Sequence, residues 1–228
     1  MKRSTYLTRF FPAVAAAVLA CLIIARLLYP ANAPEPFSDA WDTISGLGDL
    51  ENNPVGFFFF QASMVLVAAL LFPVGLHVHP RLSKYHEVAT SAGTFFLAFA
   101  ALGFFLTGLL PDGVVPVDKF HEITAGAGAL GTLLAAFFYS VSCKKAGGDL
   151  SRRVQWAIAL AWWVPLVLAG VAYGYAELVV KPAFDLGWYG AEWGEAGVPV
   201  VLSFALWERV LFGVLLAYSA LLVYLVPE

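Results

Sequence analysis

A histidine and several acids lie between two apolar segments of the chain. The stretch reads Leu110-Pro111-Asp112-Gly113, followed by Asp118-Lys119-Phe120-His121-Glu122. A histidine beside carboxylates offers the donor types of a zinc site or of a general base. A zinc site needs about three or four ligands, whereas this segment supplies one histidine and scattered acids, so we assign no metal. The alternative is a capping or hydrogen-bonding histidine, because Glu122 at a helix start suits the helix dipole.

Charged and polar side chains also fall within or at the ends of the apolar segments. Such groups are costly at membrane depth, which makes them candidates for function. We expect them near the outer leaflet, where they would line a polar pocket that opens outward. The candidates are Arg26, Gln61, Asp112, His121, Glu122, Glu177, Glu208 and Arg209. The alternative is that Arg26 pairs with Glu177 or Glu208 and pins the helix ends, because intramembrane charges usually pair with one another.

The composition indicates which elements position these residues. Of the 228 residues, 61% are hydrophobic and only 13% are charged, whereas about a quarter of the residues in a soluble domain are charged. The apolar residues form runs of the length that a helix needs to cross a hydrocarbon core of ~30 Å. A transmembrane barrel would instead show alternating segments of ~10 residues. The sequence therefore predicts an all-α, polytopic transmembrane helix bundle.

Six apolar runs predict a single transmembrane domain over residues 1–228. The expected helices are residues 10–29, 55–76, 88–110, 123–143, 154–176 and 206–226. The stretch 196–205 is also apolar, and it could be a re-entrant or interfacial segment or an early start of the last helix. Residues 31–33 resemble a signal-peptide cleavage site, but the preceding run of about 20 residues is longer than a signal core, so we expect a retained helix.

The basic residues predict the orientation. With the N-terminus inside, the inner segments hold 9 of the 13 lysines and arginines and the outer loops hold 2, while the remaining 2, Arg26 and Arg209, lie within or at the ends of helices. Inner loops are expected to carry this excess. The prediction is a multi-pass protein of the cell (cytoplasmic or inner) membrane with both termini on the cytoplasmic side. The outer loops hold most of the acids, which gives an acidic outer face.

Small residues indicate how the helices pack. Gly126, Gly128 and Gly131 make one side of the fourth expected helix nearly smooth, and Gly170 and Gly174 form a GxxxG motif in the fifth. Such residues let helix backbones approach closely. We therefore assign them to bundle packing rather than to a ligand site. No phosphate-binding loop, GxGxxG or GxSxG motif stands in a fitting context, and no cofactor is indicated.

Short motifs in the outer loops carry a resemblance to a known family. Residues 44–48 (Ile-Ser-Gly-Leu-Gly), then Asn53-Pro54, residues 108–112 (Gly-Leu-Leu-Pro-Asp) and His121 resemble an uncharacterised bacterial and archaeal six-span family, a domain of unknown function. More loosely, they resemble the eukaryotic DRAM/FRAG-type proteins. The resemblance runs from about residue 45 to 139, and the chain departs from it at Leu110, where the family often has Phe, and in a short loop before His121. It implies a six-span fold and an outward-facing polar site around Ser45, Asp112 and His121, but no established reaction.

Three classes of function follow. The first is a protein that binds a lipid or small amphipathic ligand at the outer polar pocket. The second is an accessory subunit of a larger membrane complex, with other membrane proteins as partners. The third is a membrane-embedded hydrolase that uses His121 with Asp112 or another nearby acid, with or without a metal. The lipid bilayer is the expected partner in every case, and no nucleic acid is expected.

Overall fold

The structure, a computed structural model, describes residues 9–33, 37–110, 120–147, 150–187 and 191–226. Their regular structure is helical, without strands in these ranges. The long helices are α2 (Phe11–Leu27), α3 (Gly56–Leu82), α4 (Glu87–Leu109), α5 (Phe120–Lys145), α6 (Arg152–Tyr175) and α9 (Phe204–Leu225). The short elements are η2 (Ser45–Gly48), η4 (Ala176–Val180), α7 (Lys181–Phe184), α8 (Ala191–Glu195) and η5 (Val200–Leu202).

The all-α bundle expected from the apolar runs is confirmed. Five helical segments among the described residues are long and apolar enough to cross a membrane, and α2 is a shorter apolar helix of 17 residues. Most boundaries differ from the expected ones by one to three residues, and two helices extend further. Helix α3 continues to Leu82, past the expected end at residue 76, and α6 continues through η4 and α7 as one helical run of 33 residues to Phe184.

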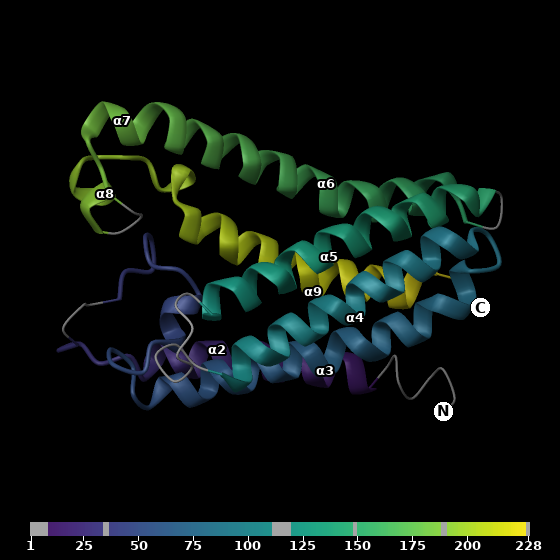
Figure 1. Ribbon diagram of the computed structural model, residues 1–228, viewed down its shortest axis with the longest axis horizontal. Coiled ribbons are helices and arrows are strands. Elements are labelled where there is room, and N and C mark those ends of the chain that lie inside the picture. The colour runs from purple at the N-terminus through teal and green to yellow at the C-terminus, as the bar shows by residue number, and fades with distance from the viewer. Residues whose placement is uncertain (1–8, 34–36, 111–119, 148–149, 188–190, 227–228) are drawn as a thin grey trace.

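The long helices run roughly side by side along the length of the molecule (Figure 1). Consecutive helices from α2 to α5 pack against one another, while α6 and α9 form a second pair that contacts α5 and α3. Helix α2 begins and α9 ends toward the same end of the bundle, which we call the inner end after the predicted orientation. The opposite end, where α2 ends and α3 begins, is called the outer end.

Small residues bring α4 and α5 into close contact, as expected for Gly128 and Gly131. A Cβ added to Gly103 would lie 2.5 Å from the Gly128 nitrogen, and one added to Gly131 would lie 2.8 Å from the Ala100 nitrogen. The expectation does not hold for the GxxxG motif of α6. A Cβ at Gly170 or Gly174 would meet nothing within 4 Å, because this face of α6 is not covered by the described part of the chain. Gly126 on α5 is equally open.

The apolar stretch 196–205 is not an early start of the last helix. The Ser203 hydroxyl accepts a hydrogen bond from the Leu206 amide and caps α9, which begins at Phe204. The residues before this cap are irregular apart from the turn η5. A serine at the N-cap satisfies one of the amides that a helix start leaves without a partner.

Candidate functional site

A buried asparagine fixes the outer end of α2 against the loop that follows it. Asn53 is fully buried, and its Nδ2 donates to the carbonyl oxygens of Ala25 at 3.1 Å and Leu47 at 2.9 Å. Its Oδ1 accepts from the amide of Gly56 at 3.1 Å. Since one side chain joins α2, η2 and α3, the position of Arg26 relative to the loop is set by local hydrogen bonds.

Arg26, at the outer end of α2, is held by an acid and an aromatic ring of this loop. Its Nε and Nη2 donate to the two carboxylate oxygens of Asp39 at 2.7 and 2.9 Å. This two-point pairing is the strongest geometry between arginine and a carboxylate. The guanidinium carbon lies 5.0 Å from the centre of the Phe37 ring, within the range of a cation–π contact. The hydrogen bonds from Arg26 hold the pKa of Asp39 below its ordinary value.

Two neighbouring charges near the start of α9 bind the same loop in different ways. The Glu208 carboxylate accepts a hydrogen bond from the Ile44 amide. Arg209 Nη2 donates to the Asp42 carbonyl oxygen at 2.7 Å, and its guanidinium carbon lies 6.0 Å from the centre of the Phe37 ring. The arginines of α2 and α9 therefore flank one aromatic ring at the outer end of the bundle.

A groove of about 330 Å³ runs between α2 and α9 beneath these charges. Apart from Arg26, Asp39 and Arg209, its lining is apolar. The lining residues are Leu19, Leu22, Ile23, Arg26, Leu27, Phe37, Asp39, Ile44, Leu47, Arg209, Phe212 and Gly213. Apart from Leu27, which directly follows Arg26, the lining residues on each helix are three, four or seven positions from its arginine, so they share one face. The groove is therefore charged at its outer end and apolar below.

The walls of the groove are exposed on both helices. Leu19, Ile23 and Leu27 are exposed at its α2 wall. A Cβ added to Gly213 would meet nothing within 4 Å, so this glycine leaves space on the α9 wall. Nearer the inner end of the bundle, the rings of Phe11 and Tyr224 meet edge to face with their centres 6.3 Å apart. This contact joins α2 and α9 beyond the residues that line the groove.

The residues of the expected outer polar cluster do not all lie together in the structure. Arg26 and Arg209 line the groove, and Glu208 lies beside it. Ser45 belongs to the same loop, where its hydroxyl is hydrogen-bonded to that of Thr43 at 2.7 Å. The alternative in which Arg26 pairs with Glu177 or Glu208 is wrong, because its carboxylate partner is Asp39.

Glu177 lies elsewhere, at the outer end of α6. Its carboxylate pairs with Lys181 one turn further along the same helical run, at 3.2 Å. The adjacent Ala176 and Val180 are buried in a small apolar cluster with Trp41 and Trp193. Glu177 is therefore not among the groove residues.

The predicted residues on α3 and α5 are not among those that line the groove. His121 is buried, its ring centre is 5.9 Å from that of Phe60, and its carbonyl oxygen accepts from the Thr124 hydroxyl at 3.0 Å. Glu122 is exposed and Gln61 is half-buried. Asp112 lies outside the described residues. Within the described ranges, no group of three or more His, Cys, Asp or Glu residues could hold a metal ion.

Sequence reasoning missed Phe37 and Asp39 as parts of the site. Asp39 stood out only as one of several acids in an outer loop, and nothing in the sequence marked Phe37. A usable signal was present on α2, where Leu19, Leu22, Ile23 and Arg26 have the spacing of a single helical face. That face is apolar with one charge at its outer end, the pattern of one wall of the groove.

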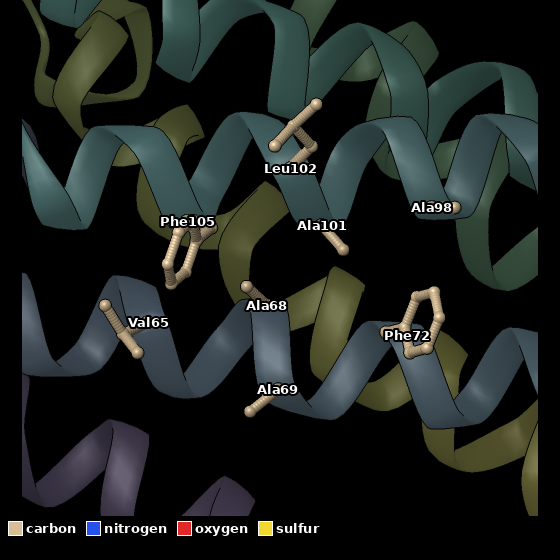
Figure 2. A pocket seen from close by; sticks show the side chains of 8 residues that line it. All are labelled: Val65, Ala68, Ala69, Phe72, Ala98, Ala101, Leu102 and Phe105. Carbon is tan, nitrogen blue, oxygen red and sulfur yellow. The ribbon is translucent and has the colours of Figure 1, made fainter.

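A second hollow lies on the bundle surface between α3 and α4. It has a volume of about 430 Å³ and is lined by Val65, Ala68, Ala69, Phe72, Ala98, Ala101, Leu102 and Phe105. Figure 2 shows the rings of Phe72 and Phe105 on either side of small alanine side chains. No polar side chain is among its lining residues. It offers no group that would orient a ligand, so we regard it as a place where hydrocarbon chains pack.

Comparison with known proteins finds no matching family model, no matching curated protein and no matching solved structure. The geometry of the α2–α9 groove is therefore the basis for a functional conclusion.

Proposed function

We propose that this chain is an integral membrane protein that binds a lipid or similar amphipathic ligand in the α2–α9 groove. The observation that carries the proposal is the distribution of polarity along the groove. Arg26, Arg209 and Asp39 gather at the outer end, and the remaining lining is apolar. An amphipathic molecule has the same division, with a polar head that matches the charges and a tail that matches the apolar walls.

The membrane orientation supports this assignment. The excess of basic residues in the inner segments predicts that the outer end of the bundle faces away from the cytoplasm. Arg26 and Arg209 then lie near the level of the outer headgroups, and Leu19 and Phe212 extend into the hydrocarbon layer. A lipid could enter sideways through the open wall of the groove without leaving its normal depth. We also propose that this is a protein of the cell membrane.

The size of the groove supports a slender ligand. Ligand pockets range from ~300 to ~1,000 Å³, and the groove, at about 330 Å³, is at the lower end of this range. One hydrocarbon chain of a lipid fits such a space better than a bulky ring system does. The polar groups that would fix its orientation are few and converge at one end, as in most ligand sites.

Native mass spectrometry of the protein in a mild detergent tests the proposal. We expect the wild-type chain to retain lipid-sized mass, and we expect Gly213→Leu to lose it, because a Cβ at this lining position meets nothing within 4 Å and the rest of the leucine side chain would occupy the groove. Gly170→Leu is the matched control, since Gly170 is also an open helix position but does not line the groove.

Two results would contradict the proposal. The first is equal lipid retention by the Gly213→Leu and Gly170→Leu variants, which would place any bound lipid elsewhere. The second is a wild-type protein that carries no lipid but retains other polypeptides at fixed stoichiometry, which would favour the accessory-subunit function.

A further inference from the structure

We infer that the ligand of the α2–α9 groove is a phospholipid with a net negative headgroup, bound by both arginines, and that Asp39 competes with it for Arg26. This inference rests on the proposed function and specifies the ligand class. It follows from three features of the groove's outer end: the balance of charge, the placement of the two guanidinium groups and the donors that they leave available.

The charges that line the groove do not cancel. Two arginines and one aspartate are among its lining residues, which leaves one positive charge. Glu208 is not among the lining residues, and its carboxylate accepts from the Ile44 amide in the loop, although it also interacts electrostatically with the neighbouring Arg209. The surface of the groove itself presents more positive than negative charge. A ligand with one negative charge complements this surface better than a zwitterionic ligand does.

The two guanidinium groups are placed to act together. They belong to different helices, and each lies near the Phe37 ring, at 5.0 Å for Arg26 and 6.0 Å for Arg209. Two like charges near one ring repel each other, and an anion between or beside them offsets this repulsion. Asp39 supplies this anion for Arg26. On the groove side, the phosphate of a lipid would do the same for both arginines.

Both arginines have donors left for a phosphate. A guanidinium carries about five N–H donors in a fixed plane. Hydrogen bonds to described residues use two N–H groups of Arg26, both to Asp39, and one of Arg209, to Asp42. Arginine binds phosphate oxygens in a two-point geometry that lysine does not reproduce. The remaining donors are sufficient for a phosphodiester between the two helices.

Asp39 is placed to compete with such a phosphate. It lines the groove beside Arg26 and already occupies two of the Arg26 donors, and its side chain is 68% exposed, whereas that of Arg26 is 39% exposed. A phosphate that takes donors from Arg26 weakens the contact between α2 and the loop. Removal of the Asp39 charge therefore strengthens the binding of an anionic lipid.

The test is a titration of the full-length protein in detergent micelles with two lipids of identical chains, dioleoyl phosphatidylglycerol and dioleoyl phosphatidylcholine. Bound lipid is counted by native mass spectrometry. We expect the anionic lipid to bind roughly tenfold more tightly, because both lipids carry the same phosphate and only phosphatidylcholine adds a positive choline group beside the two arginines. Arg209→Gln abolishes this preference, Arg209→Lys retains part of it and Asp39→Asn increases it. Inorganic phosphate at the same concentration does not displace the anionic lipid.

The outcomes separate this inference from the proposed function. Equal binding of both lipids to the wild type, with loss of both in Gly213→Leu, overturns the anionic preference and leaves the groove as a lipid site. Displacement by inorganic phosphate also overturns the inference, because a free anion is then the ligand. Lipid binding that is insensitive to Gly213→Leu overturns both. If Arg209→Gln does not fold, Arg209→Lys and Asp39→Asn still decide the charge preference.

Discussion

At the scale of single residues, the outer end of the bundle depends on a few polar side chains that each join separate segments. Asn53 links three elements through its amide group, and Arg26 links α2 to the loop through Asp39. Buried polar groups such as Asn53 are stabilising only while their hydrogen bonds are satisfied. The walls of the groove are thus held in place by contacts that single substitutions remove.

Asn53→Ala is expected to lower the free energy of unfolding by about 3 kcal/mol, because it removes three hydrogen bonds and leaves buried backbone groups without partners. Thermal unfolding of the purified protein in detergent measures the loss. Asn32→Ala is the control, since Asn32 is an exposed turn residue. Equal melting temperatures for the two variants would contradict the role given to Asn53.

Arg26→Gln is expected to raise the pKa of Asp39 toward the ordinary value of an aspartate. In the wild type the pKa is lowered, so the ion pair is complete at neutral pH, and its contribution to stability is lost as the pH falls through this lowered pKa. Titration of ¹³C-labelled aspartate by NMR measures the change. Arg152→Gln, at an exposed inner position, should leave the pKa of Asp39 unchanged. If the pKa of Asp39 were the same in the Arg26→Gln variant as in the wild type, the pairing of Arg26 with Asp39 would be contradicted.

The sequence identified Arg26 and Arg209 because the length of an apolar run fixes the depth of a residue in the membrane. It could not identify their partners, because depth says nothing about rotation around the bundle. Glu177 was expected at the same level as Arg26, yet it pairs with Lys181 on its own helix. Asp39 is the partner of Arg26 because of the path of the loop that follows α2. No periodic pattern in the sequence predicts that path.

At the scale of helices, apolar run length predicted each long element, but packing decided which faces are used. The small residues of α5 were expected to pack, and Gly128 and Gly131 do so against α4. The GxxxG motif of α6 was expected to pack in the same way, and it remains uncovered in the described part of the chain. A small-residue motif indicates that a close approach is possible, and the neighbouring helix decides whether it occurs.

Gly103→Ala is expected to destabilise the protein by roughly 1–3 kcal/mol, the usual cost of an overpacked contact. The added Cβ would lie 2.5 Å from the Gly128 nitrogen, so α4 and α5 must separate. Gly126→Ala is the matched control, because its Cβ meets nothing within 4 Å and alanine favours a helix by up to about 1 kcal/mol. The melting temperatures of the two variants should move in opposite directions. A tolerated Gly103→Ala would contradict the close contact.

At the scale of the whole molecule, the described helices form a bundle in which α2 begins and α9 ends toward the same side (Figure 1). Five of the described helical segments are long and apolar enough to cross a membrane, and α2 is a shorter apolar helix that would make a sixth crossing. The direction in which the bundle lies in the membrane is a prediction from charge alone. The orientation of the bundle decides which leaflet of the membrane supplies the ligand of the groove.

Single cysteines test this orientation. We expect Asn32→Cys, in the outer turn after α2, to react with a membrane-impermeant maleimide added to intact cells. Lys145→Cys, at the inner end of α5, should react only after the cells are made permeable. Both positions are exposed. The two native cysteines, of which Cys143 is buried and Cys21 is half-buried, define the background. The reverse labelling pattern would contradict the predicted orientation.

The groove has a direction, because Arg26 and Arg209 lie at its outer end and the contact between Phe11 and Tyr224 joins α2 and α9 nearer the inner end of the bundle. We therefore expect a ligand of the groove to be drawn from one monolayer only. In liposomes that hold the protein in random orientation, a lipid added to the external monolayer would therefore reach half of the molecules. Binding would stop at half occupancy until lipid crossed the bilayer, and the second half would fill at the rate of that crossing.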